Sequence, residues 1–187
     1  MNLLSIDYSI SGPTICIYDT ELKTYKMFSY GSKYKEDFEF KKENFHIIFS
    51  RQPKKENKDF WRKIRIANKI IEFIGENCKP NFTKTILEGY SYASTGLVFD
   101  IAEATGMMKY QLLVNGFEFD IIPSPQWKKF LFNKGNMKKN QLLEKAKDSE
   151  FSIIVDEFKE RGFSKNLTNP LDDYIDAYFI VKYLESI

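Results

Sequence analysis

Short apolar runs separated by turns open the chain. Residues 3–7, 14–18 and 25–30 are mostly apolar, and Gly12-Pro13 separates the first two runs. Runs of this length bounded by turn residues are typical of β-strands joined in an antiparallel meander. The pattern therefore predicts a sheet that begins with three consecutive strands.

The chain then alternates between helical and extended patterns. Apolar residues recur at helical spacing between 59 and 77, which predicts an amphipathic helix with a stripe formed by Phe60, Ile64, Ala67, Ile71 and Ile74. Further strands are expected at 84–88 and 119–123, and further helices at 96–113, 124–132, 137–147, 150–165 and 170–185. This order predicts a mixed α/β fold in a single domain, residues 1–187.

A charged segment interrupts this order at residues 31–58. It is rich in Lys and Glu, and only residues 45–49 have the apolar character of one more strand. Two interpretations stay open for it, an insertion in the domain or a mobile arm.

Composition narrows the class of protein. Hydrophobic residues make up 43% of the 187 residues, enough for a core, and the net charge is only +2. Cys16 and Cys78 lie far apart without a CxxC spacing, which argues against a zinc ribbon and against a disulfide-rich secreted domain. The N-terminus lacks the pattern of a signal peptide, and no apolar run approaches the ~20 residues of a membrane span. We therefore expect a cytoplasmic protein.

Two acidic residues stand at the ends of expected strands. Asp7 closes the first apolar run, and Glu88 closes the run at 84–88. A carboxylate in such a setting is unfavourable unless it is paired or bound to a metal. Each residue alone also fits a simpler role: Asp7 as an acceptor for turn amides, and Glu88 as a solvated strand end.

Three more acids, Asp172, Asp173 and Asp176, fall in the first turns of the last expected helix. Asn169 is expected at the N-cap, with Pro170 at the first helical position. Asp173 and Asp176 share one helix face, where their mutual repulsion favours a bound cation. Asp172 falls at the third helical position, so a capping role and a ligand role fit it equally well.

The order of these acids is more informative than any one of them. Magnesium prefers carboxylate and water ligands, and two magnesium ions about 4 Å apart can hydrolyse a phosphodiester. An acid ending the first strand, an acid ending a middle strand and an acid pair on a late helix predict a two-metal nuclease. His46 is the only histidine and lies in the charged segment, so a histidine general base is not expected.

Motifs around these acids resemble those of the RuvC-type Holliday-junction resolvases, especially the bacteriophage members. Residues 5–13 (SIDYSISGP) resemble the first motif of the family, residues 87–90 (LEGY) the second, and residues 172–177 (DDYIDA) the closing motif. Residues 122–129, followed by Gly135, Lys138 and Lys139, resemble the family's proline strand end and basic glycine turn. The resemblance touches nearly the full length.

This resemblance implies a ribonuclease H-like fold, with a mixed five-stranded sheet flanked by helices. It implies a homodimer that makes paired nicks in four-way and other branched DNA during recombination or replication, in the host cytoplasm if the protein is phage-encoded. Two Mg²⁺ per active site are implied, with Mn²⁺ able to substitute. The implied catalytic metal ligands are Asp7, Glu88, Asp173 and Asp176. The long segment 31–58 and the acid at Asp172 depart from the family pattern, so substrate preference can differ.

Basic and aromatic residues near these motifs suit a DNA interface. The lysines are Lys128, Lys129, Lys134, Lys138 and Lys139. DNA affinity comes largely from phosphate neutralisation, although an ordinary solvated helix face is the simpler alternative. Tyr90 and Tyr92, just after Glu88, are placed to stack on an unpaired base.

Other functions fit parts of the same sequence. A ribonuclease H-type nuclease or a flap or repair nuclease would use the same acids and differ in substrate. A non-catalytic DNA-binding module is more remote, because all four acids are present. An actin-like ATPase fragment is also remote, because no second nucleotide motif is visible. The expected helix at 97–113 carries an apolar stripe that fits either a dimer contact or an intramolecular core.

Overall fold

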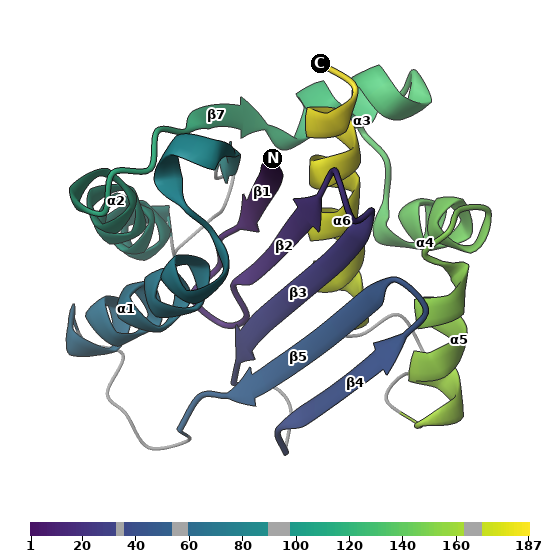
Figure 1. The fold of residues 1–187 in the computed structure, drawn as a ribbon, viewed down its shortest axis with the longest axis horizontal. Coiled ribbons are helices and arrows are strands. Elements are labelled where there is room, and N and C mark those ends of the chain that lie inside the picture. Colours follow the sequence, from purple (N-terminus) through teal and green to yellow (C-terminus); the bar gives the residue numbers. More distant parts are fainter. Residues whose placement is uncertain (33–35, 54–59, 90–97, 163–169) are drawn as a thin grey trace.

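Three consecutive strands form the centre of the sheet in the computed structural model, which describes residues 1–32, 36–53, 60–89, 98–162 and 170–187 (Figure 1). They are β1 (Asn2–Asp7), β2 (Thr14–Asp19) and β3 (Thr24–Gly31). Each pairs antiparallel with the next, so the expected meander is confirmed.

Four further strands extend the meander on both sides. On one side β6 (Thr83–Gly89) runs parallel to β1, and β7 (Asp120–Pro123) runs parallel to β6. On the other side β5 (Phe45–Arg51) runs parallel to β3, and β4 (Phe38–Lys42) is the edge strand, antiparallel to β5. The order is β4-β5-β3-β2-β1-β6-β7. The mixed α/β class is confirmed, but the sheet has seven strands where five were expected.

The additional strands come from the charged segment 31–58. In β4 the side chain of Phe40 is buried while Glu39, Lys41 and Lys42 are exposed. Charged side chains on an edge strand discourage pairing with another sheet, and they also hide the strand's alternation from a search for apolar runs. Whether the segment is an insertion relative to a smaller domain stays a prediction.

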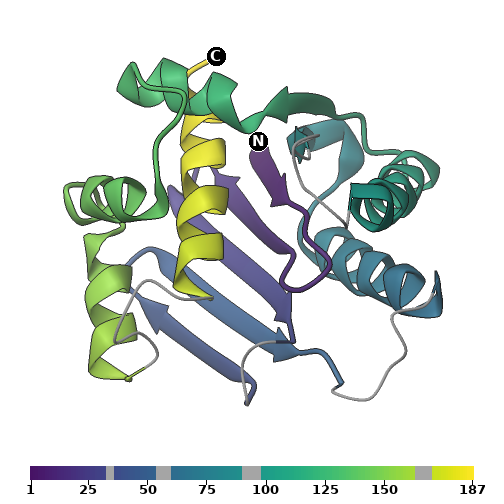
Figure 2. The same ribbon diagram turned by 180° about the vertical axis from the view of Figure 1, so that it is seen from behind.

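Helices cover both faces of the sheet. α1 (Phe60–Asn77) and α2 (Val98–Val114) lie on one face, and the short helix η1 (Pro80–Phe82) leads from α1 into β6. α6 (Leu171–Glu185) crosses the opposite face, beside α4 (Lys139–Lys147) and α5 (Ser152–Glu160), while α3 (Ser124–Phe132) packs near the end of α6 (Figure 2). Within the described ranges, no helix is long and apolar enough to cross a membrane.

The alternation of side chains along β1 separates two hydrophobic cores. Leu4 and Ile6 point toward α1 and α2, whereas Leu3 packs in the core under α6. Much of the aromatic content lies in the α6-side core, where Tyr25 stacks between Tyr18 and Phe45 at centroid distances of 4.5 Å. Many of the aromatic rings therefore fill a core.

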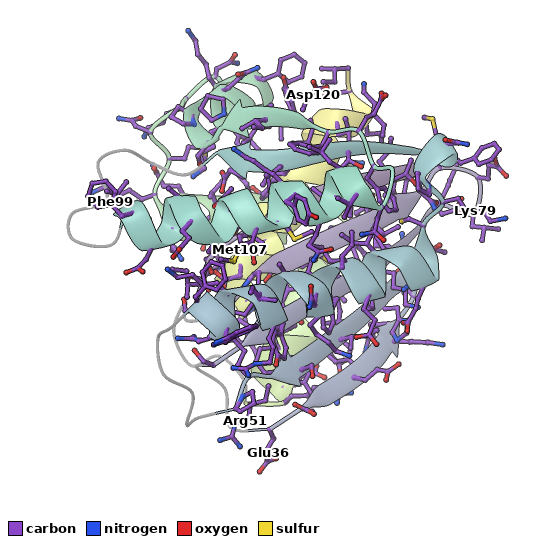
Figure 3. The ribbon with its side chains drawn as sticks, turned by 90° about the vertical axis from the view of Figure 1, so that its left-hand side faces the viewer. Glu36, Arg51, Lys79, Phe99, Met107 and Asp120 are labelled. Carbon is purple, nitrogen blue, oxygen red and sulfur yellow. The ribbon has the colours of Figure 1, made fainter. Side chains whose placement is uncertain are left out.

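The buried face of α1 differs from the expected stripe. Ala67 and Ile74 are buried as expected, but Phe60 is 52% exposed and Lys63 is buried instead. The Lys63 ammonium can occupy this face because it pairs with carboxylates of α2, which lies alongside α1 (Figure 3).

Candidate metal centre

Parallel pairing of β1 with β6 brings the first two acids together. Ile6 lies beside Leu87 in the register of these strands, so Asp7 and Glu88 follow as neighbours at the two strand ends. Because side chains alternate along a strand, Asp7 shares the face of Ser5, which is the face covered by α6.

The first turns of α6 bring the remaining acids to this face. The Ser5 hydroxyl donates a 2.6 Å hydrogen bond to the carbonyl of Ala177, which fixes the helix against β1. Asp173 and Asp176, just before this contact in the helix, are half-buried. A Cβ atom at Gly12 would lie 3.0 Å from Oδ2 of Asp173, so glycine allows the turn after β1 to approach this carboxylate closely.

The acids influence one another strongly. Burial raises the pKa of Asp7 well above its ordinary 3.8, and the charges of Glu88, Asp176 and Asp173 and a hydrogen bond with Glu88 raise it further. Burial and the charge of Glu88 raise the pKa of Asp176 to about 7, although two nearby lysines act in the opposite direction. Oδ1 of Asp176 is buried and accepts no hydrogen bond from any described residue. Carboxylates crowded in this way are stabilised by a cation.

Magnesium fits the chemistry of this set, although the ligands are not yet assembled. Four neighbouring carboxyl groups offer the oxygen donors that it prefers, and a cation would occupy the free oxygen of Asp176. Across the described part of the chain, however, no three His, Cys, Asp or Glu side chains converge as a metal-binding group. The hydrogen bond between Asp7 and Glu88 gives a physical reason, because it directs these two carboxyl groups toward each other. Metal binding would therefore require loss of a proton and rotation of these side chains.

Asp172 has a different partner from the other acids. α6 begins at Leu171 with Pro170 at the N-cap, one residue later than expected, and has no side-chain capping hydrogen bond. Asp172 is therefore the second helical residue, and Pro170 has no amide hydrogen to donate to it, so the capping role, one of the two left open for Asp172, is wrong. The buried carboxylate of Asp172 instead accepts a hydrogen bond from the ammonium of Lys139, with which it forms an ion pair.

Two of the predicted DNA-binding lysines lie close to the acids. The charges of Lys128 and Lys139 lower the pKa of Asp176. The ammonium of Lys128 also lies 4.9 Å from the ring centroid of Trp127. The other members of the predicted DNA-binding set are Lys129, Lys134 and Lys138, which are exposed, and Tyr90 and Tyr92, which lie outside the described residues.

Trp127 is a residue of this site to which the sequence assigned no role. It lies in α3, is fully buried, and donates a 2.8 Å hydrogen bond from Nε1 to Oε1 of Glu88. The sequence contained a hint of this role, because a buried indole N–H needs an acceptor and α3 directly follows the strand beside β6. The partner itself depends on tertiary packing that no local pattern specifies.

Comparison with known proteins supports the fold. No known family model matches the sequence, and no curated protein sequence matches it significantly. RuvC of Thermus thermophilus aligns with 100% of this chain and 96% of its own, with a TM-score of 0.58 and 15% identity. The same protein in complex with a Holliday junction substrate aligns with 100% of this chain and 95% of its own, with a TM-score of 0.58 and 13% identity.

A mitochondrial protein has the same architecture. The yeast mitochondrial Holliday junction resolvase Ydc2 aligns with 97% of this chain and 76% of its own, with a TM-score of 0.54 and 13% identity. Identity this low establishes the fold alone. The chain therefore has the ribonuclease H-like fold of the RuvC and Ydc2 resolvases, as its motifs predicted.

Proposed function

We propose that this protein is a metal-dependent endonuclease that cleaves four-way and other branched DNA. The observation that carries the proposal is the mutual effect of Asp7, Glu88, Asp173 and Asp176, which meet where β1, β6 and α6 come together. A cluster of acids in which the pKa values of two members, Asp7 and Asp176, are raised is typical of a functional site. The likeness to resolvase structures makes branched DNA the substrate to test first.

In this proposal the four acids would hold two Mg²⁺ ions, with Mn²⁺ able to replace them. When bound, the ions supply an activated water and neutralise charge on the attacking and leaving oxygens. Lys128 and Lys139 lie beside the acids, so their ammonium groups would balance negative charge on a phosphate that enters the site.

The DNA path in this proposal follows the lysines of α3 and α4. Lys129 lies in the last turn of α3, Lys138 is the N-cap residue of α4, and Lys134 lies in the connection between these helices. Their exposed side chains would contact phosphates, which fixes position without reading sequence. Base stacking by Tyr90 and Tyr92 stays a prediction.

A homodimer is part of the proposal, and the solvent face of α2 is its expected contact. Phe99, Tyr110 and Leu113 are 87%, 64% and 62% exposed. They lie on one side of the helix with the exposed Gly106, whose Cβ position meets nothing within 4 Å. The opposite side of α2, with Ala104, Met108 and Leu112, packs in the core. The helix therefore has an apolar surface left over for a second copy.

The test compares cleavage of a labelled four-way junction, a flap and an RNA–DNA hybrid, with and without Mg²⁺. Asp176→Asn is expected to reduce cleavage of the junction by more than about 100-fold, beyond the loss typical of a group outside the ligand set. Junction binding in a gel-shift assay should persist, because the phosphate contacts lie elsewhere. Asp156→Asn, an exposed acid on α5, is the matched control and should cleave normally.

Three outcomes would overturn parts of the proposal. Normal cleavage by Asp176→Asn would remove the assigned ligand set, and cleavage of the hybrid alone would replace the substrate with that of a ribonuclease H. Single nicks by a protein that sediments as a monomer would exclude the paired mechanism and favour a flap or repair nuclease.

A further inference from the structure

The contact between Trp127 and Glu88 joins the hydrophobic core to the proposed metal centre. The indole nitrogen Nε1 of Trp127 donates a hydrogen bond to Oε1 of Glu88 at 2.8 Å, and the ring is fully buried. The ring stacks on Phe179 of α6 at a centroid distance of 6.5 Å and an interplanar angle of 21°. A rigid ring therefore holds one carboxylate oxygen at a fixed point.

The same ring connects three elements that carry the site. Trp127 belongs to α3, Glu88 to β6, and Phe179 to the helix that also carries Asp176. Lys128 lies over the indole face at 4.9 Å, and its charge also acts on Asp176.

We infer that Trp127 is a positioning residue for Glu88, which holds one carboxylate oxygen and leaves the other directed toward a divalent cation. The inference rests on the proposed function. Hydrogen bonds from outside the ligand set orient carboxylate ligands, and their loss typically weakens metal affinity by about 10- to 100-fold.

The hydrogen bond from Trp127 matters because a second hydrogen bond, with Asp7, competes for the carboxyl group of Glu88. Glu88 also interacts with Asp7, and that bond draws the two carboxyl groups together. The indole N–H offers Glu88 a partner that carries no negative charge and cannot itself bind the metal. Without the indole, the contact with Asp7 is, among the described residues, the remaining side-chain hydrogen bond that orients Glu88.

A purely structural role makes a different prediction. A buried indole needs an acceptor for its N–H, and on this view the carboxylate merely satisfies it. Trp127→Phe would then lower stability and leave the metal affinity of the folded protein unchanged.

The experiment measures Mg²⁺ and Mn²⁺ affinity by calorimetry, without DNA. Trp127→Phe keeps a ring against Phe179 and removes the N–H, and we expect both metals to bind about 10- to 100-fold more weakly. Trp61→Phe is the matched control, because Trp61 is 66% exposed on α1, and its affinity should equal that of the wild type. The chain has only 2 Trp, so Trp61→Phe also leaves Trp127 as the sole tryptophan, whose emission should change as metal binds.

A double-mutant cycle separates positioning from general damage. Glu88→Gln keeps an oxygen that can accept from the indole but removes a charged ligand, so it should weaken metal binding on its own. In the Glu88→Gln background, Trp127→Phe should cause no further loss of affinity, because its effect passes through Glu88. An equal loss in both backgrounds would overturn the inference.

The remaining outcomes separate this inference from the proposed function. If Trp127→Phe folds and binds metal as tightly as the wild type, the positioning role is wrong and the nuclease proposal stands. If the wild type binds no divalent cation, the proposed function itself fails. If Trp127→Phe does not fold, Phe179→Leu provides a second test, because it loosens the indole ring without removing its N–H. This variant should weaken metal binding only where Glu88 is present. Unchanged metal affinity in Phe179→Leu would also overturn the inference.

Discussion

At the scale of single residues, the acids of the candidate site differ in what surrounds each carboxylate. Asp172 and Asp176 each have a buried oxygen with no hydrogen-bond partner in the described part of the chain. Among the described residues, Asp172 also has an ion pair with Lys139, and no such pair is seen for Asp176. Burial and the charge of Glu88 raise the pKa of Asp176 to about 7, against the charges of Lys128 and Lys139. A cation gains most beside a carboxylate whose charge no direct ion pair compensates. We therefore expect Asp176 to be a ligand and Asp172 to hold Lys139.

Substitution of the two aspartates should separate these roles. Asp172→Asn is expected to leave Mg²⁺ affinity within about threefold of the wild type, while Asp176→Asn should weaken it by more than about 100-fold, beyond an outer-shell effect. Calorimetric titration of both variants measures the difference. Equal losses would make Asp172 a ligand and remove the ion-pair interpretation.

At the scale of elements, the sequence predicts those parts that depend on local pattern. β1, β6 and α6 were predicted because each acid follows an apolar run or a helix start, and these elements bring Asp7, Glu88 and Asp173 together. The edge strand β4 was not predicted, since its charged residues outnumber its apolar ones. The partner of Trp127 could not be predicted, because it follows from the packing of α3 beside β6.

The buried face of α1 shows the same limit. The predicted stripe of α1 did not include Lys63, yet the side chain of Lys63 is only 6% exposed. Two carboxylates of α2, Asp100 and Glu103, compensate its charge. These contacts raise the pKa of Lys63, although burial alone would lower it. A charged residue on a buried face is predictable only once its partners are known.

Removing the two acidic charges should lower the stability of the fold more than removing the lysine charge. The double variant Asp100→Asn/Glu103→Gln leaves the buried ammonium of Lys63 without a compensating charge. We expect it to lower the free energy of unfolding by about 1–3 kcal/mol. This is less than the ~3–5 kcal/mol of a fully buried pair, because both acids are about half exposed. Lys63→Met leaves two acids that water can solvate and should cost less than about 1 kcal/mol. Urea unfolding of both variants tests this order. A larger loss of stability in Lys63→Met would contradict the expectation that an uncompensated buried ammonium is the more costly defect.

At the scale of the whole molecule, the crowded acids where β1, β6 and α6 meet oppose the stability of the fold. Packing forces Asp7 and Asp176 close to other acids, and the folded state raises the pKa of both above the ordinary 3.8. Sites arranged for function often carry such unfavourable interactions, which the rest of the fold offsets. The two cores on either side of the sheet supply that compensation here.

The pH dependence of stability follows from these shifts. As pH rises from about 4 to about 7, the unfolded chain releases protons that folded Asp176 keeps, so the folded state loses stability across that window. Asp7 acts in the same direction. Glu150 acts oppositely, because its pKa is lowered below 4.5 in the folded state, so its contribution disappears only in more acidic solution.

We therefore expect the Tm of the metal-free wild type to fall between pH 5.5 and pH 8 by more than the Tm of the variant Asp7→Asn/Asp176→Asn. A difference of about 1–3 kcal/mol corresponds to roughly 3–10 °C in a domain of this size. At pH 8, Mg²⁺ should raise the Tm of the wild type but not that of the double variant, since only the wild type gains stability by binding the ion. Scanning calorimetry at both pH values provides the measurement.

If the wild type were stabilised on going from pH 5.5 to pH 8 relative to the variant, the acids could not repel one another in the folded state. The electrostatic basis for a cation between β1, β6 and α6 would then be absent.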